Sequence, residues 1–236
     1  MNDIFSYAWK VFSHNFRYLT HLIVPFLLLG FLSYFTSQPV DENNIRVPLI
    51  GLVLYLLGFS MYMGALIFFV SQEYQKKLDP VTTNLFNSMV YAPLLMLTLL
   101  ITNLPLIIVV ILITTPNAYQ FIALPLLLFG IYVSLKATFA PFHLMLEGCN
   151  PVVAIKKSFR HTDGRVGKII IILLAFYLFT ALVDGLTHFK TPFEVFNSIL
   201  FLVGVALTLL MVALQQIAVF KLYVNSCVEM NKEQKS

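Results

Sequence analysis

The stretch VPLIGLVLYLLGFSMYMGALIFFVSQ, from Val47 to Gln72, runs for 26 residues without a charge and decides the fold of this chain. A helix rises 1.5 Å per residue, so roughly 20 apolar residues cross the hydrocarbon core of a bilayer. This stretch is long enough to do so, and stretches of the same kind occur six times along the chain. Most of the protein is therefore expected to lie in a membrane, where every backbone polar group needs an internal partner.

The composition supports the same conclusion. Of 236 residues, 59% are hydrophobic and 11% are charged, whereas a soluble domain carries about 25% charged residues. Six spans and short loops use nearly the whole length and leave no room for a separate soluble catalytic domain. The net charge of +4 would suggest nucleic acid in a soluble protein, but here it indicates basic loops held against anionic lipid head groups. We expect membrane lipids as partners, and no nucleic acid.

The predicted fold class is an all-α integral membrane protein, a single polytopic domain covering residues 1–236. The predicted spans lie at residues 19–37, 48–71, 93–114, 120–142, 168–187 and 195–221. The second and sixth are the clearest, since Lys136 and Asp184 interrupt the fourth and fifth. The first apolar run follows a long lead-in and is not followed by a small-x-small cleavage site, so we expect a retained span rather than a signal peptide.

The distribution of basic residues predicts the orientation. The N-terminus, the loops at 72–92 and 147–168 and the C-terminal tail hold twelve of the fifteen Lys and Arg residues: Lys10, Arg17, Lys76, Lys77, Lys156, Lys157, Arg160, Arg165, Lys168, Lys221, Lys232 and Lys235. Because short loops rich in Lys and Arg stay in the cytoplasm, both termini are predicted to be cytoplasmic. Cys149 and Cys227 fall on the same side, where a disulfide is not expected.

Segments before the first, third and fifth spans are predicted to form amphipathic helices in the membrane interface. The apolar stripe of the first consists of Phe5, Trp9, Phe12 and Phe16. The candidate helix caps Asp3, Asp79 and Asn150 are 76 and 71 residues apart. This spacing fits three parallel units, each an interfacial helix followed by two spans. It also fits the alternation that any membrane protein with an even number of spans shows, and both interpretations stay open here.

Basic residues near the inner boundary are the candidate lipid-binding residues: Lys136, Lys156, Lys157, Arg160 and Arg165. Lys136 lies within the fourth span, roughly 22 Å along the helix from Phe121 and so near the inner boundary. From there its ammonium can extend to the head groups or contact a lipid phosphate. An intramembrane charge can also serve in a substrate or proton pathway.

Thr102, Asn103 and Gln215 are the polar residues predicted to lie deepest in spans. Pro105 follows Asn103 closely and breaks the helical hydrogen-bond ladder. Polar groups beside a broken helix form binding sites in transporters, and they also occur as hydrogen-bonding contacts between packed helices. A solute-transport site at these three residues is therefore the alternative functional hypothesis.

Catalytic and metal-binding motifs are absent from the sequence. His143, Glu147, Cys149, His161 and Asp163 cluster near the predicted inner face, but their spacing matches no metal motif. The sequence contains no G-x-S-x-G, no P-loop and no dinucleotide fingerprint. We therefore expect no catalytic residues, no metal, no cofactor and no enzymatic activity.

Three motifs in the middle of the chain carry a resemblance: KATFAP at 136–141, LE at 146–147 and PVVAIKKSF at 151–159. They resemble the YciC-like family of uncharacterised bacterial inner-membrane proteins, and AWKVF at 8–12 is similar in style to that family's lead-in. The chain is also distantly similar to the membrane region of some glycerophosphodiester phosphodiesterases. The resemblance implies a multi-pass protein of the inner membrane and carries over no catalytic residue.

These patterns together favour a non-enzymatic inner-membrane protein that serves envelope or lipid homeostasis. It would act through contacts with lipids, in particular anionic ones, with a membrane-protein partner or with a second copy of itself. The alternative is a permease for a small or amphiphilic solute.

Overall fold

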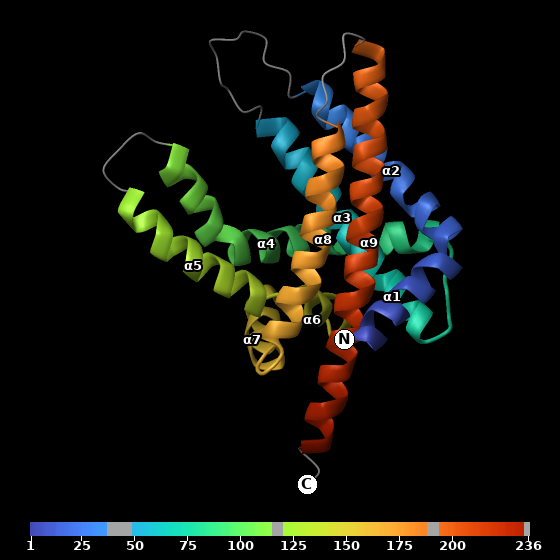
Figure 1. Ribbon diagram of the computed structural model, residues 1–236. Helices are drawn as coiled ribbons and strands as arrows, with labels where there is room; N and C mark the ends of the chain where they lie inside the picture. Colours follow the sequence, from blue (N-terminus) through green and yellow to red (C-terminus); the bar gives the residue numbers. More distant parts are fainter. Residues whose placement is uncertain (37–48, 115–119, 188–193, 234–236) are drawn as a thin grey trace. The chain divides into compact units, whose positions relative to one another are not determined.

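The computed structural model describes residues 1–36, 49–114, 120–187 and 194–233 (Figure 1). These ranges contain helices and turns and no strand, which confirms the all-α fold class. The helices are α1 (Asn2–His14), α2 (Phe16–Thr36), α3 (Leu49–Tyr74), α4 (Val81–Thr114), α5 (Gln120–Lys136), α6 (Ala140–Leu146), α7 (Pro151–His161), α8 (Val166–Thr187) and α9 (Glu194–Glu233).

Five stretches of the described residues are long and apolar enough to cross a membrane. They are Val53–Tyr74, Val81–Ile113, Phe121–Leu146, Val166–Val183 and Leu202–Glu229. Each overlaps one of the last five predicted spans, although the stretch over the third span begins at Val81 rather than at 93 and the stretch over the sixth extends to Glu229 rather than to 221. The first predicted span, 19–37, falls largely on α2, whose described apolar portion Phe16–Leu29 is shorter than a span requires. Five spans are therefore confirmed as apolar helices of sufficient length, and a sixth is not.

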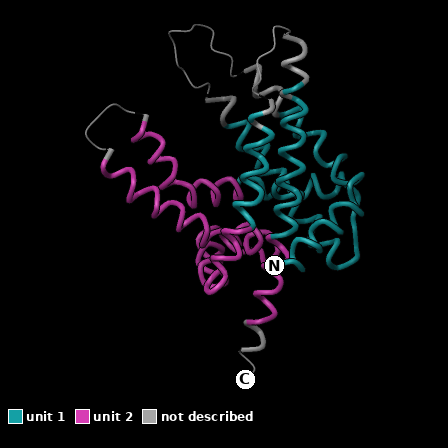
Figure 2. Tube along the Cα trace, in the orientation of Figure 1, with its two compact units in different colours: residues 1–93, 172–218 teal, residues 94–171, 219–236 magenta. Residues whose placement is uncertain are grey.

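The chain divides into two compact units (Figure 2). Unit 1 comprises residues 1–93 and 172–218, and unit 2 comprises residues 94–171 and 219–236.

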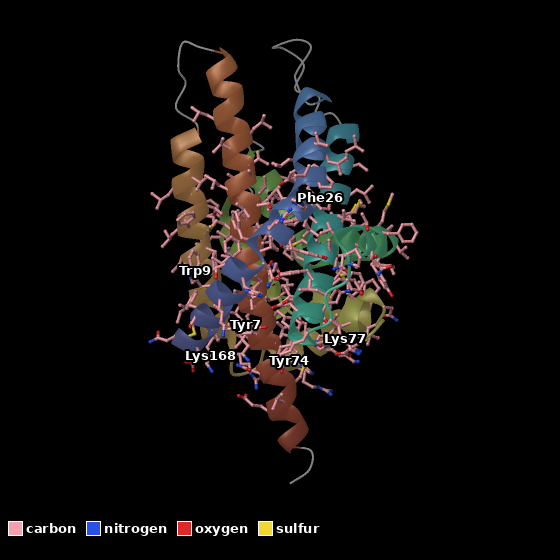
Figure 3. All side chains as sticks on the ribbon, turned by 90° about the vertical axis from the view of Figure 1, so that its right-hand side faces the viewer. Tyr7, Trp9, Phe26, Tyr74, Lys77 and Lys168 are labelled. Carbon is pink, nitrogen blue, oxygen red and sulfur yellow. The ribbon has the colours of Figure 1, made fainter. Side chains whose placement is uncertain are left out.

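In unit 1, α2 packs along α3 through aromatic side chains. The rings of Tyr18 and Phe69 stack at 5.1 Å, and the ring of Tyr62 lies at the same separation from that of Phe26. Phe26 is labelled in Figure 3. The Tyr62 hydroxyl donates a hydrogen bond to the backbone oxygen of Leu209 in α9. Buried hydroxyls need such partners where lipid surrounds the helices, because no water is available to them.

The N-terminal helix α1 differs from its prediction in two respects. Its N-cap is Met1 and not Asp3, whose carboxylate lies in the first turn. The helix ends at His14, so the predicted stripe does not continue along one helix to Phe16. The exposed fraction is 61% for Trp9 and 46% for Phe16, and α1 buries a different set of side chains: Ile4, Ala8, Val11 and Phe12. Trp9 therefore lies on the exposed face of α1, whereas Phe12 of the same predicted stripe is buried.

The helix predicted to begin after a cap at Asp79 also starts at a different residue. The amides of Thr83 and Asn84 donate to the carbonyl oxygen of Pro80, which places the first turn one residue later than predicted. The Asp79 carboxylate instead accepts a hydrogen bond of 2.8 Å from the Gln72 amide. The helix α4 then continues without interruption, rather than as a short interfacial helix followed by a span. The three-unit repeat is not confirmed, since the three predicted starts are not built alike.

Unit 2 contains a turn that breaks one apolar stretch into α5 and α6. The helix α6 packs against α7, and α9 packs on α6 through ring contacts from Phe142 to Phe220 at 5.6 Å and to Tyr223 at 5.3 Å. The connection to α7 passes through Gly148, whose φ of +64° falls in the left-handed region that favours glycine.

Candidate functional site

The helix α7 begins where the sequence predicts. The Asn150 side chain accepts a hydrogen bond of 2.9 Å from the Val153 amide, and Pro151 occupies the first turn, where it lacks only a donor that would be unpaired. The helix ends at His161, close to the predicted Asp163-Gly164 turn. Both ends follow from local chemistry that a sequence shows directly.

One face of α7 is a stripe of small side chains, Ala154, Ser158 and Thr162, spaced four residues apart and fully buried. Four-residue spacing places them on one side of the helix. Small residues allow the backbones of packed helices to approach closely. The stripe therefore seats α7 against the chain that connects α5 to α6.

The hydroxyls of this stripe form hydrogen bonds with backbone groups at the break between α5 and α6. Ser158 Oγ accepts from the Phe139 amide at 3.0 Å and donates to the Lys136 carbonyl oxygen at 2.7 Å. Thr162 Oγ1 lies 3.3 Å from the same carbonyl oxygen. A helix break frees backbone groups that are costly to bury unpaired. The stripe thus fixes α7 to the break by hydrogen bonds as well as by packing.

Lys136, the last residue of α5, is 7% exposed. Its ammonium forms an ion pair with the Asp163 carboxylate at the end of α7 and lies 5.9 Å from the centre of the Tyr132 ring. The Asp163 carboxylate thus compensates the buried charge, as a lysine placed among apolar groups requires. Its predicted contact with lipid phosphate stays a prediction.

Glu147, the C-cap of α6, accepts three hydrogen bonds from nitrogen and oxygen donors, besides a longer contact from Cys149 Sγ. They come from Lys157 Nζ at 2.5 Å, from His143 Nδ1 at 2.6 Å and from the Tyr223 hydroxyl at 3.1 Å. Burial opposes ionisation of this carboxyl, but the hydrogen bonds from Lys157 and His143 outweigh it and lower the pKa of Glu147 to about 2. The same contact raises the pKa of Lys157. Glu147 therefore carries a fixed negative charge that joins α6, α7 and α9.

Two histidines lie beside this carboxylate. The rings of His143 and His161 meet edge to face with their centres 4.6 Å apart. His143 is fully buried, and its Nε2 has no hydrogen-bond partner among the residues that the structure describes. Cys227 Sγ lies 3.8 Å from His161 Nδ1. Burial, and then the neighbouring His143, lower the pKa of His161.

The five predicted lipid-binding cations separate into two groups. Lys136 and Lys157 form the ion pairs described above, and Arg165 pairs with the Glu229 carboxylate near the end of α9. Lys156 and Arg160 are exposed, and the described part of the chain places no carboxylate in an ion pair with either of them. They are the two cations of the set that remain open to an external anion.

Lys156 and Arg160 lie four residues apart, and Val152 lies four residues before Lys156, so all three share one face of α7. We call these three residues the outer stripe. Val152 is 62% exposed. The outer stripe thus presents an apolar side chain followed by two cations, on the side of α7 away from Ser158. Ile155 and Phe159, the larger apolar residues of this helix, are half-buried.

Thr102 and Asn103, two of the predicted transport residues, are partnered within unit 2. The Asn103 amide nitrogen donates to the Leu99 carbonyl oxygen at 2.8 Å, and Ser134 of α5 donates to its amide oxygen at 3.2 Å. Thr102 is buried and donates to the same carbonyl oxygen of Leu99. Gln215 belongs to unit 1. The structure therefore joins the first two in a contact between α4 and α5.

Among the described residues, no group of three or more His, Cys, Asp and Glu side chains is arranged to hold a metal ion. The sequence predicted that His143, Glu147, Cys149, His161 and Asp163 cluster near one face; unit 2 brings the first four together, whereas Asp163 pairs with Lys136. It missed Tyr223, which lies 76 residues after Glu147 and contacts it. The four-residue spacing of the buried stripe on α7 was the available signal for Ser158 and Thr162.

Comparisons with protein-family models, with curated proteins and with solved structures find no match for this chain.

Proposed function

We propose that this chain is a non-enzymatic multi-pass protein of a bacterial inner membrane that binds anionic lipid head groups through the outer stripe of α7. The observation that carries the proposal is the exposure of Lys156 and Arg160 on one helical face, in a region where the other predicted cations are paired internally. The sequence contains no catalytic motif, which supports a binding role rather than an enzymatic one.

The charge and the shape of the outer stripe both suit a membrane surface. A Lys or Arg close to anionic lipid contributes about 1 kcal/mol. Val152 precedes the two cations by one and two helical turns, so it can enter the boundary between head groups and acyl chains while they contact phosphates. On this proposal α7 lies in the cytoplasmic interface, both termini are cytoplasmic, and the resemblance to the YciC-like family is in keeping with the location. A role in envelope or lipid homeostasis follows from lipid recognition of this kind.

Native mass spectrometry of the protein in gentle detergent tests the proposal. The protein is incubated with equal amounts of phosphatidylglycerol and phosphatidylcholine, and the bound lipids are counted. We expect a preference for phosphatidylglycerol that Lys156→Gln with Arg160→Gln reduces by about fivefold for each cation. The same spectrum records a retained second copy or a partner protein, which would extend the proposal to protein contacts.

Lys76 and Lys77 provide the matched control, because they are exposed cations in the turn before α4. Lys76→Gln with Lys77→Gln removes the same charge and should leave the preference intact. Equal losses in the two double variants would show that net charge alone attracts the lipid. An unmodified protein with no preference would overturn lipid recognition altogether.

A permease for a small or amphiphilic solute is the second candidate function. It is favoured by the polar cluster of Thr102, Asn103 and Ser134 between two apolar helices. Replacing Asn103 with Leu should then abolish solute flux in proteoliposomes, whereas unchanged flux would assign the cluster to helix packing.

A further inference from the structure

The histidine pair of unit 2 is placed where three elements meet. His143 belongs to α6 and His161 to the last turn of α7, and the ring of Tyr223 from α9 lies 5.1 Å from the first and 6.5 Å from the second. The Glu147 carboxylate can only accept a hydrogen bond at neutral pH, so His143 carries its proton on Nδ1. Its buried Nε2 is then an acceptor without a partner among the described residues.

The charged groups around the pair disfavour the binding of an additional proton. The groups that face it are Glu147 from α6, Lys157 from α7, Arg165 directly after α7, and Tyr223 and Cys227 from α9. Glu147 is the one carboxylate in this set, and it is already paired with Lys157. A proton on His161 would therefore place a new positive charge beside Arg165, whose partner Glu229, like Glu147, is already engaged in an ion pair. Burial adds to this cost, so the packed arrangement disfavours the charged form of His161.

We propose that His143 and His161 form a proton-binding site whose occupation releases α7 from α6 and from residues 219–229 of α9. In the released state the imidazoles reach water, where the charged form is stable. The three helices lose their ring contacts and the hydrogen bond from Tyr223 together, because these contacts share the same side chains. The proposal concerns the inner face of α7 and stands apart from lipid binding by its outer stripe.

The pH range follows from the environment of His161. Its pKa in the packed state is lowered below the ordinary value of 6.5, so the released state binds the proton more readily. The packed state is fully favoured above pH 6.5 and loses stability as the pH falls below it. Each unit of acidification down to the lowered pKa raises the opening constant up to about tenfold for each proton taken up. Glu147, with a pKa of about 2, stays ionised throughout this range.

Hydrogen exchange of the full chain in lipid nanodiscs measures the release. The protection of peptides covering α7 is followed from pH 7.5 to pH 5.5, after correction for the pH dependence of intrinsic exchange. We expect protection to fall by up to about tenfold for each proton that the pair takes up in the unmodified protein. His161→Gln removes one of the two titrating rings and should give a shallower profile, whereas His14→Gln, which changes an exposed histidine of α1, should retain the full slope.

A direct titration of the unmodified protein, with its histidines labelled for NMR, keeps the test independent of how well the variant folds. His161 should titrate below 6.5. A value at or above 6.5, an unmodified protein without a pH slope in α7, or a His161→Gln variant with the same slope would each overturn the proposal.

Discussion

Ser158→Ala is the substitution that tests most directly how α7 is held to the break between α5 and α6. Ser158 is fully buried, and its hydroxyl bridges two backbone groups at the break between α5 and α6. Alanine retains the helix propensity and nearly the same volume, so the change removes the two hydrogen bonds and little else. It leaves the amide of Phe139, itself fully buried, without an acceptor.

The magnitude follows from these contacts. A buried donor left unpaired costs about 1–3 kcal/mol, and a lost hydrogen bond whose acceptor keeps another partner costs about 0.5–1.5 kcal/mol. The Lys136 carbonyl belongs to the second case, because Thr162 Oγ1 still lies 3.3 Å away. The two contributions together lower the free energy of unfolding by about 1.5–4.5 kcal/mol. Thr162→Val removes the one hydroxyl proton that Thr162 can donate to the carbonyl oxygens of Lys136, Ser158 or Phe159, and should cost about 0.5–1.5 kcal/mol.

The assay is reversible unfolding in mixed micelles, with the double variant completing a thermodynamic cycle. Because Ser158 and Thr162 share the Lys136 carbonyl, the double variant should lose more than the sum of the single losses. Ser13→Ala, which removes an exposed hydroxyl from α1, should change stability by no more than about 0.5 kcal/mol. A Ser158→Ala protein within about 0.5 kcal/mol of the unmodified one would refute the bridging role.

Two further predictions concern the same unit. A Cβ at Gly130 would lie 2.7 Å from Leu106 Cδ2 and 3.2 Å from the Leu106 backbone nitrogen. Gly130→Ala should therefore destabilise the α4–α5 contact by about 1–3 kcal/mol in the micelle assay. The control is Gly167→Ala, which should not destabilise, because a Cβ there meets no atom within 4 Å. The pKa of Glu147 is lowered from 4.5 to about 2, so its contribution to stability is present above pH 4.5 and is lost as the pH falls toward 2. Unfolding measured across this range should show a slope that Glu147→Gln reduces, and an identical slope in that variant would contradict the assignment.

Local chemistry explains what could be predicted from the sequence. Apolar length alone located five of the six spans, because the thickness of a bilayer fixes how many residues a crossing helix needs. Asn150 was predicted correctly as a cap, since its side chain and the amide it accepts from are three residues apart. Asp79 was not, because Gln72 from the preceding helix binds its carboxylate. A cap is predictable only while no residue from another element competes for it.

The site itself depended on contacts between distant parts of the chain. Tyr223 joins Glu147 across 76 residues, and Ser158 reaches Lys136 across 22. The pattern of basic residues showed where cations gather but could not show which of them an internal carboxylate pairs. Glu229, which binds Arg165, lies in the part of α9 that continues beyond the predicted span. The division of the cations into paired and exposed ones therefore came from the structure.

Extraction of membranes with alkaline carbonate tests the central claim most directly, because every inference above takes lipid as the surroundings of the five long apolar helices. The account predicts that the protein stays with the sedimented membranes, since a chain that crosses the bilayer several times cannot be released without dissolving the lipid. Release of the full-length chain into the carbonate supernatant would contradict it.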